Sequence, residues 1–190
     1  MPVNVIDQSV STRPATPSAA AIPDLPGGAA AGRALAVLRI LLGGILLWAF
    51  ADKVFGLGFA TPTAKSWLAG GSPTAGYLGS LKGSLAGAFQ PLAGNPAVDA
   101  AFMLGLLLVG AALVLGVALR AAAVGGTALM FLMWLTALPI KTNPVMDEHI
   151  IYAAAMIALA ATGAGRVWGF GHRWTERLAA APTAMRAALT

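Results

Sequence analysis

Four long apolar segments dominate the hydropathy pattern of this chain, at about residues 34–55, 98–119, 121–140 and 147–165. A bilayer core about 30 Å thick needs about 20 helical residues to cross it, and all four segments are within tolerance of that length. The second and third segments meet at Arg120 with almost no residues between them, which indicates a tight antiparallel turn. The pattern predicts an all-α fold, an integral membrane four-helix bundle that occupies residues 33–165.

The segments outside this domain have different compositions. Residues 1–32 are rich in Pro, Ala, Ser and Gly, which predicts a disordered N-terminal tail. Residues 56–95 form an outer loop that is too long for a turn, and residues 62–68 within it predict a short interfacial helix. A long outer loop of this kind is a candidate lid over the mouth of the bundle. Residues 166–190 predict a basic cytoplasmic tail with an interfacial anchor and a short amphipathic helix.

The amino-acid composition also indicates a membrane protein. Hydrophobic residues make up 58% of the 190 residues and charged residues only 10%, against about 45–50% and about 25% in soluble globular proteins. The chain contains no cysteine, which excludes disulfides, iron–sulfur clusters, c-type haem attachment and CxxC thiol chemistry. A redox b-type haem usually needs two intramembrane histidines, and only His149 is near the membrane. The sequence therefore predicts neither a metal nor a haem.

The formal net charge of +5 is distributed unevenly along the chain. Its basic residues form no run among aromatic residues, so the predicted partner is the lipid bilayer and not nucleic acid. With the N-terminus inside, all eight arginines lie on or near the cytoplasmic side, and the four lysines lie outside. Cytoplasmic segments of membrane proteins carry the excess of Lys and Arg. The predicted localisation is therefore the cell membrane, multi-pass, with the N- and C-termini cytoplasmic.

A competing interpretation concerns the first apolar segment, which ends in Ala49-Phe50-Ala51. This is the A-x-A form of a signal-peptidase site, and cleavage there would leave three helices. However, a tail of 32 residues precedes the segment, and Arg39 interrupts the apolar region. We therefore expect the first helix to be retained.

The pattern N-P-x-x-D occurs twice, at residues 95–99 and at residues 143–147, and each copy opens an apolar segment. Each segment ends near an arginine, Arg120 in the first copy and Arg166 in the second. The repeat predicts two tandem helical hairpins related by a pseudo-twofold axis along the membrane normal. Helix capping is sufficient to explain the asparagine and the proline of each copy, because Asn is a favoured N-cap and Pro suits the first helical position.

Ionisable residues at membrane depth are costly and are candidates for function by default. Arg39 and Lys53 are 14 residues apart, close to four helical turns, so they share one face of the first helix. We expect that face to point inward. Asp52 and Lys53 at its outer end would meet Asp147 and His149 if the first and fourth helices are neighbours. The candidate catalytic residues are therefore Arg39, Lys53, Asp147 and His149.

Nearby aromatic residues predict a pocket for a flat ligand. Trp48, Trp134 and Tyr152 would wall an outer-facing polar pocket beside Asp52, roofed by the long loop, and would sandwich a ligand such as a quinone. His149 would donate or accept a proton near neutral pH. A simpler interpretation stays open, in which the carboxylates are solvated charges at helix ends and His149 is an interfacial residue.

Two stretches resemble the DoxX/DoxD-like membrane protein family. They are the Leu-Arg-Ile-Leu-Leu-Gly run at residues 38–43, followed by Asp52 and Lys53, and the Asp-Glu-His-Ile-Ile-Tyr run at residues 147–152. The resemblance covers about residues 34–170 and implies a four-helix membrane fold. The better-described members are subunits of thiosulfate:quinone oxidoreductase. The resemblance therefore implies quinone as the cofactor and the subunits of a redox complex as partners.

Three functional hypotheses follow. The leading one is a DoxX-like integral membrane subunit of a quinone-linked oxidoreductase. The second is a non-catalytic membrane anchor or assembly partner for a redox complex. The third is a small-solute or lipid carrier, which needs a polar path through the inner half of the membrane, where only Arg39 supplies a charge. The catalytic hypothesis instead needs polar side chains that converge at one mouth of the bundle.

Overall fold

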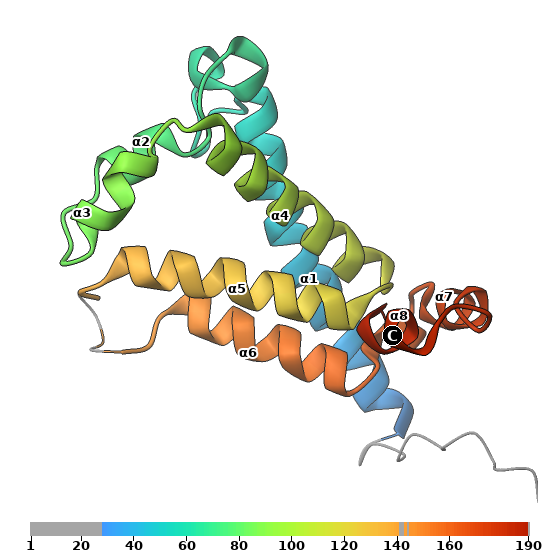
Figure 1. Ribbon diagram of the computed structural model, residues 1–190. Coiled ribbons are helices and arrows are strands. Elements are labelled where there is room, and N and C mark those ends of the chain that lie inside the picture. Colours follow the sequence, from blue (N-terminus) through green and yellow to red (C-terminus); the bar gives the residue numbers. More distant parts are fainter. Residues whose placement is uncertain (1–27, 141–142, 144, 190) are drawn as a thin grey trace, which may run out of the picture.

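The computed structural model describes residues 28–140, 143 and 145–189 of the chain (Figure 1). The described part is helical throughout and contains no strand. Four longer helices form its framework: α1 (Gly28–Phe55), α4 (Pro96–Leu115), α5 (Leu119–Ala137) and α6 (Glu148–Ala161). The all-α prediction is therefore confirmed for this part of the chain.

The connecting segments and the C-terminal region are made of short helices. Four of them are α-helices, α2 (Ala75–Gly79), α3 (Ala86–Phe89), α7 (Gly171–Arg177) and α8 (Thr183–Leu189). The others are 3-10 turns, η1 (Thr63–Lys65), η2 (Trp67–Ala69), η3 (Gln90–Leu92) and η4 (Ala164–Arg166). The short helix predicted at residues 62–68 corresponds to η1 and η2. The tail predicted at 166–190 contains two helices where the sequence indicated one.

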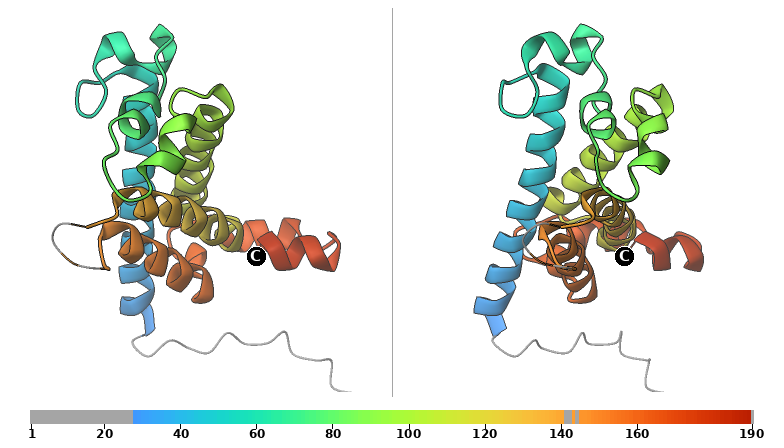
Figure 2. Two further views of the ribbon diagram at one scale, coloured as in Figure 1. Left: turned by 60° about the vertical axis from the view of Figure 1, so that its left-hand side comes forward. Right: turned by 90° about the vertical axis from the view of Figure 1, so that its left-hand side faces the viewer.

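The four longer helices pack as two pairs. Helix α1 packs along α4, and α5 packs along α6. Figures 1 and 2 show that the axes of one pair cross those of the other and do not run parallel to them. The predicted pairing of the first helix with the second and the third with the fourth is observed. The four-helix bundle that the sequence predicts is not confirmed.

Three of these helices, α1, α4 and α5, are long and apolar enough to cross a bilayer, which indicates a membrane protein. Helix α6 is shorter, with 14 residues and a length of about 21 Å at about 1.5 Å per residue. It ends at Ala161 because Gly163 adopts a left-handed conformation with φ of 61°, and the chain then turns away from the helix axis. The predicted range of 147–165 was therefore too long for this helix.

Helix boundaries differ from the predicted ones for local reasons. Helix α1 begins at Gly28, so residues 28–32 are helical and do not belong to the predicted tail; residues 1–27 lie outside the described residues. Helix α4 ends at Leu115, four residues before the predicted end, because Gly116 has a left-handed φ of 71°. These shifts leave the order of the helices unchanged.

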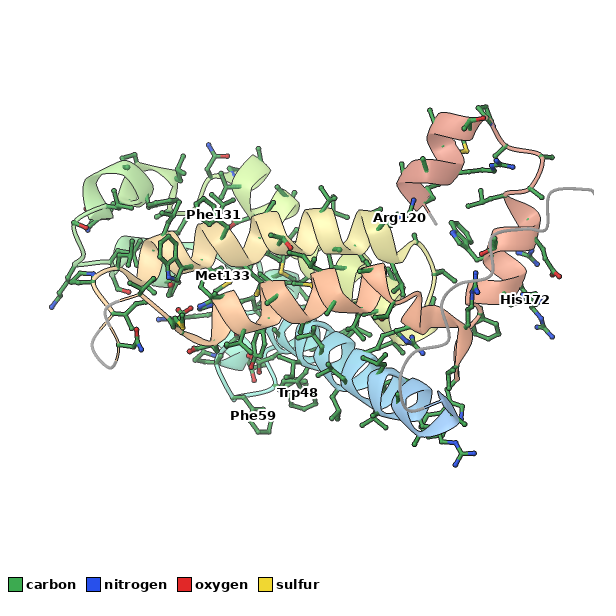
Figure 3. The ribbon with its side chains drawn as sticks, turned by 90° about the horizontal axis from the view of Figure 1, so that it is seen from below. Trp48, Phe59, Arg120, Phe131, Met133 and His172 are labelled. Carbon is green, nitrogen blue, oxygen red and sulfur yellow. The ribbon has the colours of Figure 1, made fainter. Side chains whose placement is uncertain are left out.

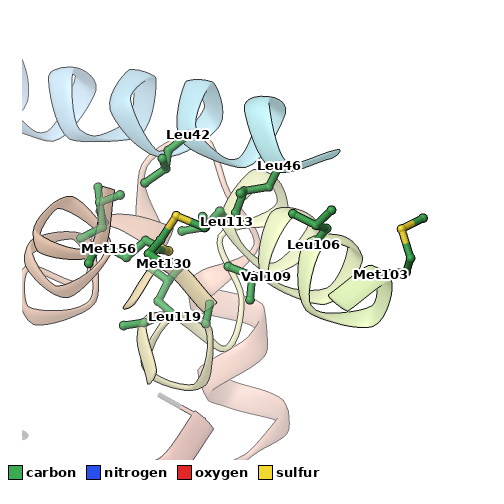
Figure 4. Close-up of a cluster of buried hydrophobic side chains, with 14 residues drawn as sticks. Leu42, Leu46, Met103, Leu106, Val109, Leu113, Leu119, Met130 and Met156 are labelled. Atoms are coloured by element: carbon green, nitrogen blue, oxygen red, sulfur yellow. The ribbon is translucent and has the colours of Figure 1, made fainter. Parts of the chain in front are cut away.

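The core lies where the two pairs meet. Leucines of α1, apolar residues of α4 and methionines of α5 and α6 form one buried cluster, which Figure 4 shows. Small residues let the backbones approach: a Cβ atom added at Gly43 of α1 would lie 2.8 Å from the carbonyl oxygen of Gly110 in α4. Close backbone approach at glycine is typical of helices that associate in lipid. It therefore accounts for the tight α1–α4 pair.

Candidate functional site

Charged side chains are buried at two places in the molecule. The first, which we call the arginine end, consists of Arg39 with the α4–α5 turn (residues 113–118) and the segment that follows α6 (residues 164–171). The second, which we call the loop end, consists of the long loop (residues 56–95) with the helix ends it contacts, and we include in it the partly buried start of α6, which lies apart from the end of α1. The candidate site residues divide between these two ends.

At the arginine end, Arg39 is fully buried, with no exposed surface. Its guanidinium donates to four backbone carbonyls: those of Leu113 and Val114 at the end of α4, and those of Val167 and Trp168 after α6. The carbonyls at a helix C-terminus lack intrahelical donors and carry partial negative charge. Arg39 therefore supplies hydrogen-bond donors and a positive charge to the carbonyls at the end of α4, and it joins this helix end to the segment after α6.

Glycines allow this close packing around Arg39. A side chain at Gly165 would collide with the carbonyl group of Gly116, and a Cβ atom at Gly169 would lie 3.0 Å from Nη2 of Arg39. The backbone N–H of Phe170 donates to the carbonyl of Leu115 at 2.8 Å. The arginine end is thus a tightly packed structural joint. Arg39 was a candidate catalytic residue, but its enclosure by backbone leaves no surface for a ligand.

At the loop end, Asp52 is also buried, with 2% of its surface exposed. Its two carboxylate oxygens accept from the backbone N–H groups of Phe59 and Ala60, at 3.2 and 3.0 Å. The carboxylate therefore holds the start of the long loop against the end of α1. It was predicted to line a ligand pocket, but both of its oxygens are used by the loop.

Asp99 in the first turn of α4 has a similar role that the sequence analysis missed. One carboxylate oxygen accepts from the hydroxyls of Ser72 and Thr74, at 2.9 and 2.5 Å, and from the backbone N–H of Thr74 at 3.1 Å. Further along the loop, the hydroxyl of Tyr77 lies 2.8 Å from that of Thr136 in α5. The Ser-Pro-Thr sequence at residues 72–74 was the signal that could have predicted this contact, because its two hydroxyls can donate hydrogen bonds to a carboxylate.

Lys53 does not join the polar cluster predicted for it. Its amine lies 6.0 Å from the ring centroid of Phe102 in α4, a distance at which a cation–π attraction operates. Among the described residues, no carboxylate lies within ion-pair distance of Lys53. Figures 1 and 2 show that the end of α1 and the start of α6 lie apart. The expected meeting of Lys53 with Asp147 and His149 is therefore not observed.

Asp147 and His149 do come together, at the start of α6. The Nδ1 atom of His149 lies 2.8 Å from one carboxylate oxygen of Asp147, and the two side chains are only 15% and 8% exposed. The other oxygen accepts from the backbone N–H groups of His149 and Ile150. One carboxylate thus caps the helix and orients the imidazole.

The charge state of Asp147 follows from these contacts. Asp147 precedes α6 and lies outside the three candidate spans. Burial by itself raises the pKa of its carboxyl group, but the hydrogen bond from His149, the backbone N–H groups and the attraction to His149 outweigh it, and they lower the pKa below its ordinary value. With Asp147 ionised, Nδ1 of His149 is the donor of the shared hydrogen bond. In the neutral imidazole, Nε2 is then a proton acceptor.

The aromatic residues do not form the predicted sandwich. Trp48 is half-exposed and meets Phe59 edge-on at 5.1 Å. Trp134 stacks on Phe131 at 5.6 Å, and its indole N–H donates to the carbonyl of Val145. Figure 3 shows Trp48 and Phe59 on the opposite side of the α5–α6 pair from Phe131. The structure therefore does not bring Trp48 and Trp134 together as walls of one pocket.

The two N-P-x-x-D copies also differ in structure. In the first, Asn95 is the N-cap of α4 and accepts from the N–H groups of Ala97 and Val98. In the second, Asn143 accepts from Val145 and Met146 in a turn before the helix, and the N-cap of α6 is Asp147. The predicted capping role is confirmed for Asn95 and wrong for Asn143; Pro144 lies outside the described residues. The second helix starts later in its motif, and this shift brings Asp147 next to His149.

No protein-family model, no curated protein and no solved structure matches this chain. The assignment of function therefore depends on the geometry of the two ends and on the sequence motifs.

Proposed function

We propose that this chain is a membrane subunit of a quinone-linked oxidoreductase, similar to the DoxX-like subunits of thiosulfate:quinone oxidoreductase. The observation that carries the proposal is the Asp147–His149 pair. One imidazole nitrogen is held by a carboxylate, and Nε2 has no hydrogen-bond partner among the described residues. The resemblance of residues 147–152 to the DoxX/DoxD-like family supports the same function, because this stretch contains the pair.

The chemistry of the pair suits a quinone. When bound, a quinone supplies two-electron redox chemistry, and its ring oxygens gain or lose protons. His149 would accept or donate one of these protons at Nε2, while Asp147 would orient the ring. Tyr152 is three residues further along α6, so it shares a helix face with His149 and provides part of an apolar wall. The chain has no cysteine to hold an iron–sulfur cluster, so the electrons pass to or from a partner subunit.

Quinone binding by matched histidine variants tests this proposal. The chain has two histidines, and His172 on α7 is exposed and paired with Glu176, so His172→Ala is the control for His149→Ala. We expect purified protein titrated with decylubiquinone, followed by tryptophan fluorescence, to bind at least tenfold more weakly after His149→Ala. The control should bind like the wild type. Equal affinities of both variants and the wild type would contradict the proposal.

The proposal includes four membrane crossings, with α6 as a short fourth span and both termini cytoplasmic. The distribution of the eight arginines supports this orientation. Because the chain lacks cysteine, a single introduced cysteine reports its side without background. Ser84→Cys should react with an impermeant maleimide in intact cells, and Ala180→Cys should react only after lysis. The reverse pattern would overturn the orientation.

A non-catalytic anchor is the second candidate, and one observation favours it. Helices α7 and α8 form an exposed basic unit, which includes Arg173 and Arg177 and is held to α5 by a hydrogen bond from Arg120 to the carbonyl of Ala187. Such a unit suits docking of another subunit. In that case, deleting residues 171–190 would release the partner subunits, and His149→Ala would leave the activity of the complex unchanged. The carrier hypothesis loses its main support, because Arg39 is enclosed by backbone carbonyls.

A further inference from the structure

We infer that the face shared by α5, α6 and α8 binds one anionic phospholipid, with an acyl chain along α5 and the phosphate at Arg120. The inference is independent of the proposed quinone chemistry, because the Asp147–His149 pair takes no part in it. It starts from an open apolar groove of about 1170 Å³ that these three helices line.

The groove has the chemistry of an acyl-chain site. Apart from Thr127 and Arg120, its walls are alanines, glycine and a few larger apolar side chains, and the exposed ones include Val124 at 74%, Ile157 at 53% and Phe131 at 49%. Helix α5 is one of the three helices able to cross a bilayer, so hydrocarbon is the medium next to this face. From Arg120 to Phe131 the helix rises about 16 Å, at about 1.5 Å per residue, which is comparable to the length of an acyl chain.

One end of the groove is polar and positively charged. Arg120 lines it there, and Figure 3 shows Arg120 and Phe131 on the same side of α5, well separated along the helix. Ala187 of α8 closes this end and also belongs to a second hollow of about 360 Å³, which is lined by Thr175, Thr183 and Arg186. The two adjacent hollows, one apolar and one with hydroxyl and guanidinium groups, match the two parts of a phospholipid.

Charge selects an anionic headgroup over a zwitterionic one. Arg120 uses one guanidinium nitrogen for the carbonyl of Ala187, and a guanidinium has donors left for a phosphate in bidentate geometry. Arginines outnumber acidic residues between residues 166 and 189 by four to one. An anionic lipid is therefore attracted to this end more strongly than a zwitterionic one.

Two variants and two matched controls test the site in delipidated protein in a neutral detergent. Arg120→Gln removes the charge but keeps a donor for Ala187, and Gly125→Leu fills the groove, where the nearest atom to a new Cβ is Val109 Cγ2 at 3.8 Å. Arg33→Gln, at another exposed arginine, and Gly44→Leu, where a Cβ meets nothing within 4 Å, are the controls. Ala128→Leu fills the same groove if Gly125→Leu does not fold.

Native mass spectrometry of the wild type with dioleoylphosphatidylglycerol should show one bound lipid. Arg120→Gln and Gly125→Leu should bind this lipid at least tenfold more weakly. The affinity of the two controls should stay within twofold of the wild type. Equal binding of dioleoylphosphatidylcholine would overturn the selectivity. Full competition by inorganic phosphate would show a free-anion site instead. If the groove-filling variants lose dimers and not bound lipid, the inference is wrong and the face instead binds a second copy of the chain. Unchanged lipid binding by both variants would also overturn the inference.

Discussion

Arg39 at the arginine end is fully buried and the Asp147–His149 pair at the loop end is largely buried, but the partners of these ionisable groups differ in kind. Four backbone carbonyls surround the guanidinium of Arg39, whose side chain has no exposed surface. The carboxylate of Asp147 holds His149 by one nitrogen and leaves the imidazole 15% exposed. The first arrangement uses the charge to join segments, whereas the second keeps a proton-exchanging atom available.

The other buried carboxylates resemble Arg39 more than they resemble the pair. Asp52 uses both of its carboxylate oxygens to hold the long loop by backbone N–H groups, and Asp99 uses one oxygen to hold it by two hydroxyls and a backbone N–H. Burial of a charge in this protein is therefore a poor indicator of function. The more useful criterion is whether a group retains an unpaired atom that a ligand can reach, because Nε of Arg39 also has no partner but is fully buried, whereas the imidazole of His149 is 15% exposed.

Removing Arg39 should produce the largest effect. Arg39→Met leaves carbonyls at the end of α4 and after α6 without a donor, at a cost of about 1–3 kcal/mol each. We expect a strong loss of thermal stability in detergent, or no folded protein at all. Arg39→Lys should recover only part of the stability, because an ammonium lacks the planar set of donors.

Arg33 is exposed on the same helix, so Arg33→Met is the control for this prediction. Equal unfolding temperatures of Arg39→Met and Arg33→Met would show that the joint at the arginine end contributes nothing to stability.

Overpacking the same joint should have the next largest effect. A methyl group at Gly165 would meet the carbonyl group of Gly116, and steric overpacking of this kind costs about 1–3 kcal/mol. Gly165→Ala should therefore lower the unfolding temperature, whereas Gly44→Ala, where a Cβ meets nothing within 4 Å, should not. A stable Gly165→Ala variant would mean that α6 and the α4–α5 turn are not in tight contact.

Asp147 should contribute a smaller, pH-dependent part of the stability. Because the pKa of Asp147 is lowered in the folded protein, its contribution is present above its ordinary pKa of about 3.9 and is lost as the pH falls through the folded-state pKa. Asp147→Asn keeps an N-cap acceptor, so at pH 7 it should lower the free energy of unfolding by about 2 kcal/mol at most. The difference in unfolding temperature between wild type and variant should shrink as the pH is lowered from about 5 to about 3. A constant difference over this range would contradict the ionised, hydrogen-bonded state of Asp147.

Lys53 should show the smallest effect. Its cation–π contact with Phe102 predicts a loss of about 0.5–1 kcal/mol for Lys53→Met. The structure separates Lys53 from Asp147, so the effects of Lys53→Met and Asp147→Asn should be additive. A coupling above about 1 kcal/mol in a double-mutant cycle would restore the polar cluster expected from the sequence.

The sequence was sufficient to locate the long helices but not to orient them. Apolar length identified the ends of α4 and α5 to within four residues and the start of α1 to within six, and the N-cap signal of Asn95 was correct. At residues 143–147 the N-P-x-x-D pattern predicted the wrong N-cap, because in this second copy Asn143 lies in a turn and Asp147 is the N-cap. Hydropathy cannot indicate how two helix pairs cross, because helices in lipid are apolar on most sides. The expected meeting of Lys53 and His149 depended on that crossing, and it is not observed.

The contacts of the candidate site were predictable from the sequence only where they are local. Asp147 and His149 are two residues apart in the sequence, so their pairing is local, and both were candidate catalytic residues. The inward position of Arg39 followed from helical spacing, but its role depends on carbonyls more than 70 residues away in sequence. Asp99 was assigned no role because its partners, Ser72 and Thr74, lie in a loop whose path has no hydrophobic pattern.

The most direct test of this contrast compares quinone affinity per folded molecule in His149→Gln and Arg39→Lys. We expect His149→Gln to lower the affinity for decylubiquinone at least tenfold with little change in unfolding temperature. Arg39→Lys should lower the unfolding temperature and leave the affinity of the folded fraction unchanged. The opposite result, a folded Arg39→Lys protein that no longer binds quinone beside a His149→Gln protein that does, would place the functional site at the arginine end.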